Sequence, residues 1–202
     1  MRDIFTAELT ALGEDLVAMG RLVETAITSA GEALLTGDLT LAESVIADDH
    51  TIDAMERDLD ERCVMLIAQQ QPVARDLRVI IAGLRMSASL ERMGDLARHV
   101  AQVARLRYPG AAIPAELVPT FTAMHLAAIE VARRVTTVME TEDLSLAAEI
   151  DGVDDSLDRL LAAVFAATTA DPCPRFGDHG VSVAERVVYL VTGEVEEHHR
   201  AH

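Results

Sequence analysis

Four acidic residues in the first half of the chain have the types and spacings that suit cation binding. Asp49 and Asp53 are four residues apart, and so are Glu91 and Asp95. Residues four apart on an α-helix lie one above the other on the same face, so each pair would present two carboxylates together. Hard cations prefer oxygen ligands. One such pair is weak evidence because acidic helix faces are common, but two pairs on adjacent helices are stronger.

The position of Glu91 adds to this interpretation. The segment before Glu91 has a packing stripe whose residues follow one another at steps of three and four: Leu77, Ile80, Leu84 and Ser87. Glu91 is the next residue of this stripe. A carboxylate on or beside a packing stripe needs a compensating partner, either a cationic side chain or a metal ion. The pattern therefore leaves two interpretations open, a metal site and an ion-paired, metal-free cluster.

Long helices are expected to carry these residues. The first, over residues 3–36, alternates three- and four-residue steps, which is the seam spacing of an antiparallel bundle. The second, over 38–70, has apolar residues at steps of seven, and Asp38 suits its N-cap. Pro72 separates it from the third, over 73–107. The seam residues are Leu9, Leu12, Leu16, Met19, Val23, Ala26, Ala30 and Ala33 in the first helix, and Val45, Ile52, Leu59 and Leu66 in the second.

A linker and an internal repeat divide the chain into two domains. Tyr108-Pro109-Gly110 has the composition of a linker, and a fourth helix is expected over 115–140 with Phe121, Met124, Ala128, Val131, Val135 and Val138 as its stripe. The segment 36–42 recurs at 141–147, an offset of 141 − 36 = 105, which indicates two copies of one helical unit.

The second copy is expected to be shorter than the first. Arg92-Met93-Gly94-Asp95 recurs as Arg175-Phe176-Gly177-Asp178, an offset of only 178 − 95 = 83, so about 22 residues are missing between its second and third helices. The sequence therefore predicts an all-α protein of two tandem antiparallel three-helix bundles. The first spans 1–108, the second, truncated, spans 109–193, and 194–202 form a tail.

Two stretches resemble the signatures of a known family. The run QQPVARDLRVIIAGLRMSASLERMGDLARHVAQ and the later GDHGVSVAERVVYLVTGE are similar to the PhoU family of phosphate-uptake regulators, and the resemblance covers nearly the whole chain in the family's order. It implies two tandem three-helix bundles, usually as a homodimer, without enzymatic activity. It also implies negative regulation that links a phosphate ABC transporter, through its ATPase subunit, to a sensor histidine kinase.

The resemblance further implies metal binding, often as iron clusters, through paired acidic-x-x-x-Asp motifs. In the first repeat both pairs are complete, with Asp49 and Asp53 followed by Glu91 and Asp95. In the second repeat Asp154, Asp158 and Asp178 persist, but Pro174 occupies the position that matches Glu91. Proline supplies no ligand and does not suit a helix interior, so metal binding is expected at the first site more than at the second.

Composition narrows the choice of partner and compartment. The chain has 34 acidic residues against 17 basic ones, all of them arginine, for a formal net charge of −17. Such a surface does not attract nucleic acid or favour direct anion binding, whereas cation binding is natural. No apolar run is long enough to span a membrane, the first residues do not read as a secretory signal, and the two cysteines make no disulfide framework. A cytoplasmic location is expected.

Two other features carry alternative interpretations. Arg78, Arg85, Arg92 and His99 fall on one heptad line beside the carboxylates. Neutralisation of the acids by surface ion pairs is the simpler explanation, and a docking stripe for a partner is the other. The histidines of the tail lie beyond the last packed helix and suggest a solvated segment.

Two rival functions remain. The first is a degenerate paralogue that acts mainly as a dimerisation or metal-binding module. The second is a carboxylate-bridged di-iron enzyme, which needs two Glu-x-x-His motifs facing the core. The sequence offers only Glu196 with His199, in the tail, so the enzyme hypothesis is weakly supported.

Overall fold

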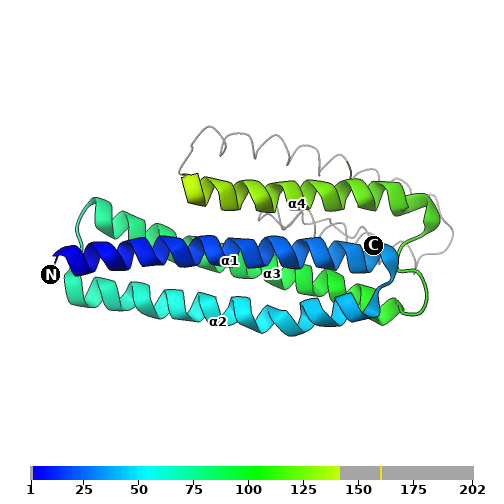
Figure 1. Ribbon diagram of the computed structural model, residues 1–202, viewed down its shortest axis with the longest axis horizontal. Coiled ribbons are helices and arrows are strands. Elements are labelled where there is room, and N and C mark those ends of the chain that lie inside the picture. The colour runs from blue at the N-terminus through cyan, green and yellow to red at the C-terminus, as the bar shows by residue number, and fades with distance from the viewer. Residues whose placement is uncertain (1, 142–159, 161–202) are drawn as a thin grey trace, which may run out of the picture.

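The computed structural model describes residues 2–141 and residue 160, and all its regular secondary structure there is helical. Three long helices, α1 (Arg2–Thr36), α2 (Leu39–Gln70) and α3 (Arg75–Arg107), form a bundle in which α2 runs antiparallel to both α1 and α3 (Figure 1). A short 3₁₀ turn (Ala115–Leu117) leads into α4 (Val118–Thr141), which packs along α1 on the side away from α2. The expected all-α bundle is confirmed. The shortened hairpin of the second repeat lies outside the described residues.

The helix boundaries follow the expected signals with small differences. Asp38 caps α2 as predicted, since its Oδ1 accepts a hydrogen bond of 3.0 Å from the backbone N–H of Leu41. Gly37 ends α1 with φ +72°, in the left-handed region that glycine adopts without strain. The third helix begins at Arg75 and not at residue 73, because Ala74 has φ +50° and is not helical. The fourth begins at Val118, since 115–117 form the 3₁₀ turn.

The predicted seams form most of the core, although Leu9 and Ala26 of α1 and Val135 and Val138 of α4 are only partly buried. All four seam residues of α2 are buried, and the apolar stripe of α4 is buried from Phe121 to Val131. In α3 the buried line runs through Ile80, Gly83 and Ser87. Leu77, expected in that stripe, remains 36% exposed. Seven residues of an α-helix make slightly less than two full turns, so residues seven apart are displaced gradually around the helix axis. Leu77, Leu84 and Glu91 therefore lie at the edge of the core.

Glycines bring α4 close to α1. A Cβ atom on Gly20 would lie 2.7 Å from Met139 Cε, and one on Gly31 would lie 2.0 Å from Nδ1 of His125. At the far end of α4, Arg21 and Glu140 form an ion pair of 2.5 Å. Close packing at two glycines and one surface ion pair thus fix α4 along α1.

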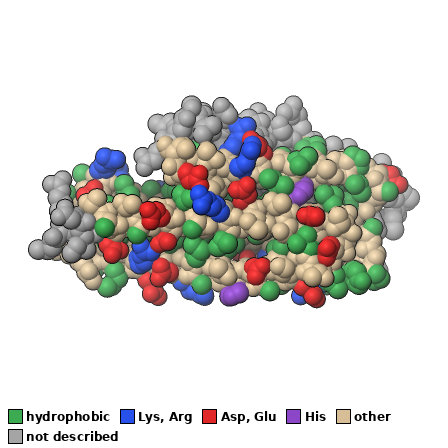
Figure 2. Space-filling view, viewed as in Figure 1, with side chains coloured by type: hydrophobic (Ala, Val, Ile, Leu, Met, Phe, Trp, Pro, Cys, Tyr) green, Lys and Arg blue, Asp and Glu red, His purple; other side chains and the backbone are tan. Residues whose placement is uncertain are grey.

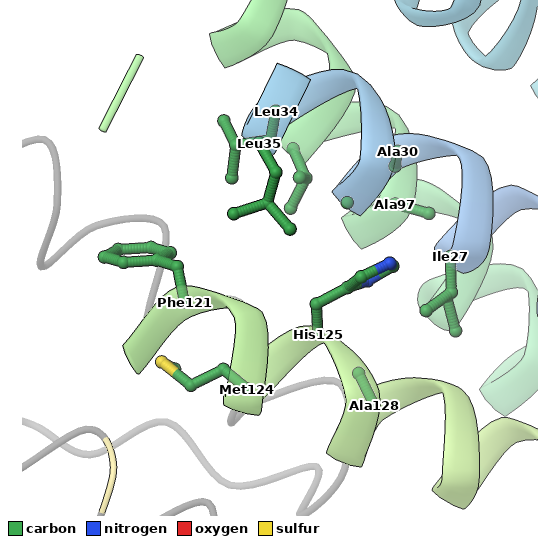
Figure 3. A pocket seen from close by; sticks show the side chains of 11 residues that line it. Ile27, Ala30, Leu34, Leu35, Ala97, Phe121, Met124, His125 and Ala128 are labelled. Carbon is green, nitrogen blue, oxygen red and sulfur yellow. The ribbon is translucent and has the colours of Figure 1, made fainter. Parts of the chain in front are cut away.

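His125 lies in a small, mostly apolar pocket where α1, α3 and α4 meet. The side chain points from α4 toward α1, among Ile27, Ala30 and Ala128 (Figure 3). The remaining space is about 30 Å³, close to the size of one or two water molecules. Burial lowers the pKa of His125 below its usual value, and the nearby Glu32 carboxylate opposes that shift by favouring the imidazolium.

Acid should destabilise the fold partly through His125. The unfolded chain binds a proton on this imidazole more readily than the folded chain does. The contribution of neutral His125 to the free energy of unfolding is therefore complete at pH values above about 6.5, the pKa of histidine in an unfolded chain. It decreases as the pH falls toward the lower pKa that His125 has in the folded chain. Urea denaturation at about pH 8 and about pH 5.5 should show a smaller loss of stability for His125→Gln than for the wild type. The exposed His50→Gln is the control, and equal losses in all three proteins would refute the expectation.

None of the helices in the described part of the chain is long and apolar enough to cross a membrane.

Candidate metal centre

The two acidic pairs of the first repeat meet across the α2–α3 interface. Asp49 and Asp53 lie on α2, and Glu91 and Asp95 lie on α3. Gly94 allows the two helices to approach, because a Cβ atom there would lie 3.0 Å from Ile52 Cδ1 and 3.7 Å from Oδ1 of Asp49. The glycine therefore positions the carboxylates of α2 beside those of α3. Acidic side chains are also prominent over the rest of the visible surface, where arginines are fewer (Figure 2).

Arg98 bridges the two helices at this point. Its Nε lies 2.6 Å from Asp49 Oδ2, and its Nη2 donates a hydrogen bond to Asp95 Oδ1. The Asp49 side chain is only 10% exposed, whereas those of Arg98 and Asp95 are half-buried. A nearly buried carboxylate is costly without a cation, and Arg98 supplies that compensation. The structure thus contains the ion-paired arrangement that the sequence allowed as an alternative to metal.

The carboxylates nevertheless crowd one another. The pKa of Asp49 is raised, first by burial and then by Asp53 and Asp95, while Arg98 opposes the shift. Burial also raises the pKa of Glu91, and its acidic neighbours, Asp95 first, raise it further. One guanidinium therefore faces several carboxylates, and the cluster keeps an excess of negative charge.

The donor set fits a hard cation in its chemistry. Carboxylate oxygens from two rigid helices, with unbalanced negative charge, are what such an ion requires. Within residues 2–141, however, no group of three acidic, histidine or cysteine side chains is arranged to hold a metal ion. Arg98 already contacts the carboxylate oxygens of Asp49 and Asp95 that a metal ion would need as ligands. The donor chemistry thus suits the ion, whereas the arrangement of these side chains does not, and metal binding would require Arg98 to release Asp49 and Asp95.

A groove between α1 and α2 reaches Asp49 from the other side. It has a volume of about 260 Å³ and includes Ser44, Asp48, Asp49 and Thr51 among its lining residues. Ser44 Oγ donates a hydrogen bond of 3.1 Å to Asp48, which is exposed at the rim. Solvent and small ions therefore have a route toward Asp49.

Sequence reasoning missed three residues of this cluster. Arg98 follows Glu91 by seven residues, on the same line as Leu77 and Leu84, so its position was available from the spacing. Glu56 lies seven residues after Asp49 and contributes to the raised pKa of Glu91. Gly94 gave no signal of its own, because close approach of two helices is a tertiary property.

The predicted metal ligands of the second repeat, the cysteine of α2 and the di-iron motif remain to be compared with the structure. Asp154, Asp158 and Asp178 of the second repeat, with Pro174, lie outside the described residues. Cys63 is a buried free cysteine, and burial is the main cause of its raised pKa, which is typical of an unreactive thiol. In the described helices no histidine follows a glutamate by three residues, so the di-iron motif has no counterpart there.

Fold and site together define an all-α bundle protein with a carboxylate cluster between two of its helices. A family model described as "PhoU domain" matches residues 16–104. The "Phosphate-specific transport system accessory protein PhoU homolog 2" of Mycobacterium tuberculosis is 37% identical, covering 96% of this chain and 99% of that protein. The PhoU homolog 1 of Mycobacterium leprae is 36% identical, covering 98% and 96%. The chain belongs to the PhoU family.

Solved structures agree with this assignment. The crystal structure of PhoU from Pseudomonas aeruginosa is similar with a TM-score of 0.77 and 30% identity, covering 94% of this chain and all of that one. The phosphate transport system regulatory protein PhoU from Streptococcus pneumoniae gives a TM-score of 0.74 at 25% identity. The resemblance seen in the sequence motifs is therefore confirmed over nearly the whole chain.

Proposed function

We propose that this chain is a non-enzymatic negative regulator of phosphate uptake and of the phosphate-starvation response in the cytoplasm. It would act as an adaptor between the ATPase subunit of a phosphate ABC transporter and a sensor histidine kinase, as a homodimer. The observation that carries the proposal is the match over 96% of the chain to a relative named as an accessory protein of the phosphate-specific transport system. The absence of a membrane-spanning helix from the described part is compatible with this role.

Regulation of this kind requires a difference in affinity between two states. A regulator shifts the kinase toward its inactive form only by as much as it binds that form more tightly. The acidic cluster offers a source of such a difference, because its charge changes when a cation replaces Arg98 as the counter-charge. Such a change would alter the surface formed by α2 and α3.

The proposed metal, divalent or trivalent and including an iron cluster, would be held by Asp49, Asp53, Glu91 and Asp95. When bound, it would neutralise these carboxylates and tie α2 to α3. Arg98 would then act as the counter-ion of the metal-free state, and the guanidinium and the metal would compete for Asp49 and Asp95. In the second repeat, a weaker site at Asp154, Asp158 and Asp178 remains part of the proposal.

Metal content is the direct test of this site. We expect protein purified without chelator to contain at least about one equivalent of metal, and Asp49→Ala and Glu91→Ala to lose it, because each removes an oxygen ligand. Arg98→Ala should bind the metal more tightly, because it removes the competing cation. Elemental analysis and titration with ferrous and manganous ions measure both effects. The control is Asp48→Ala, which changes an exposed neighbour outside the cluster.

A metal-free wild type with unchanged helicity in all variants would contradict the metal site. The carboxylates would then form an ion-paired cluster around Arg98, and Arg98→Ala would lower stability without changing metal affinity. Circular dichroism and urea denaturation of the same four variants separate these two results.

Complementation tests the regulatory role itself. In a bacterial strain that lacks its phosphate regulator, the wild-type chain should switch off phosphate-starvation genes in phosphate-rich medium. Expression of a starvation-responsive reporter measures the effect. Persistent reporter expression, with a folded chain present, would favour the degenerate-paralogue hypothesis.

A further inference from the structure

The outer face of α3 combines exposed arginines with exposed apolar side chains. Acidic residues make up 34 of the 202 residues of the chain, yet residues 77–90 include none. Arg78 and Arg85 are exposed in this stretch, and Arg92 follows at the same step of seven. No carboxylate in the described part of the chain forms an ion pair with this arginine line. Arg98 is the arginine of α3 that compensates the acidic cluster.

A second apolar seam runs along α3 beside the arginine line. Its residues follow one another at steps of four and three, which is the spacing of a and d positions in a coiled coil, and they are Leu77, Ile81, Leu84 and Ala88. Leu77 and Ile81 are each 36% exposed, Ala88 is exposed and Leu84 is half-buried. This outer seam therefore differs from the buried line of α3 that packs inside the bundle, because solvent still reaches it.

Each arginine of the line directly follows a d position of this spacing. If Leu77 is taken as a d position, Arg78, Arg85 and Arg92 are successive e positions. In coiled coils, residues at e and g pair with opposite charges on the partner helix and determine which helix binds. The three arginines have the place and the exposure for such pairs. The outer face of α3 is therefore complementary to a helix that has an apolar line with acidic residues along one flank.

The spacing of the arginines fits a helical partner and not a strand or a lipid surface. Residues seven apart on a helix are about 10.5 Å apart along the axis and are displaced gradually around it, so a second helix follows them in a left-handed supercoil. Side chains on one face of a β-strand recur about every 6.6 Å and would fall out of step. Anionic lipid headgroups would be repelled by Glu91 and Asp95, which continue the seam, and by the net charge of −17.

The neighbouring helix α2 determines which flank of the bound helix is acidic. Asp60 follows Asp53 by seven residues, so both lie on one line of α2. This line faces α3, because Asp53 contributes to the raised pKa of Glu91. Asp60 is exposed, and within the described part of the chain it forms no ion pair. It would repel acidic residues on that flank, so the acidic flank of a bound helix must face the arginine line.

We infer that the outer face of α3 docks an acidic amphipathic helix of a partner protein. The outer seam receives the apolar line of that helix, and the arginine line pairs with its acidic flank. Burial of the seam favours association, and the ion pairs select an acidic helix over a neutral or basic one. The inference rests on the proposed function only for the existence of a protein partner, and it adds the surface and the chemistry of the contact.

Synthetic peptides test this chemistry with the full chain. Each peptide has about four heptads, with leucine at the a and d positions and glutamate at three successive steps of seven along one flank. Two versions place the glutamates on opposite flanks, so that both helix directions are covered. Fluorescence anisotropy should show saturable binding of one version, although peptide and chain are both negatively charged. Replacing its glutamates by glutamine should weaken binding about tenfold, because three ion pairs of small individual strength are lost.

Charge reversal tests whether the peptide lies on the arginine line. Arg85→Glu should weaken binding of the glutamate peptide about fivefold, because one attraction becomes a repulsion. A peptide with lysine in place of the central glutamate should bind Arg85→Glu more tightly than it binds the wild type, since the central charges lie opposite each other. Arg105→Glu is the matched control, because it makes the same change at an exposed position of α3 outside the line. It should leave the affinity for both peptides unchanged.

Several results would overturn the inference. They are no binding of either glutamate peptide, equal binding of the glutamate and glutamine peptides, and equal effects of Arg85→Glu and Arg105→Glu when both variants have native circular dichroism. A lower sedimentation mass for Arg85→Glu than for the wild type would assign the face to a second copy of the chain, and would overturn the inference as well. The peptide measurements need no transporter, kinase or metal, so they can fail while complementation succeeds, and the reverse.

Discussion

Replacing Leu12 by alanine should lower the free energy of unfolding by about 2–5 kcal/mol. Leu12 is 1% exposed, and its Cδ2 lies 3.1 Å from where a Cβ atom of Gly83 would be. The leucine of α1 thus fills the space that the glycine of α3 leaves. Truncation would remove buried apolar surface and leave a cavity at the contact that positions α3, the helix that carries Glu91 and Asp95.

Urea denaturation followed by circular dichroism measures this loss. Leu22→Ala is the matched control, because Leu22 lies on the same helix but is 38% exposed. Its effect should stay within about 0.5 kcal/mol. If Leu12→Ala were no more destabilising than Leu22→Ala, the packing of α1 on α3 described above would be wrong.

Gly31→Ala should also destabilise the fold, by about 1–3 kcal/mol. The new Cβ would lie 2.0 Å from Nδ1 and 2.6 Å from Cγ of His125, so the whole ring must move and α4 must shift from α1. The substitution improves helix propensity by up to about 1 kcal/mol, which offsets part of the cost. The net loss is therefore a measure of how closely α4 packs on α1.

A double-mutant cycle identifies the contact responsible. In a His125→Ala background the clash is absent, so Gly31→Ala should cost little or become stabilising. Gly13→Ala is the control, because a Cβ atom there meets nothing within 4 Å and should stabilise α1. Equal costs of Gly31→Ala with and without the histidine would show that the ring is not the obstacle.

The sequence by itself determined the helices, most of the core and the family. Steps of three, four and seven residues predicted the buried seams of α1, α2 and α4, because a helix places such residues on one side regardless of its neighbours. Asp38 marked the start of α2 for the equally local reason that its side chain caps the nearby backbone. The acidic pairs were visible for the same reason, as residues four apart on one helix.

Only the tertiary structure decided how the helices are rotated and how closely they approach. Periodicity gives the apolar side of a helix but not its rotation against a neighbour, so Leu77 was expected in the core and is exposed. Arg98 contacts Asp49 across 49 residues of sequence because Gly94 lets α3 approach α2. Whether a carboxylate pairs with arginine or with metal depends on which charges packing brings within reach. That is set by side-chain volumes at the helix contacts, which local patterns do not encode.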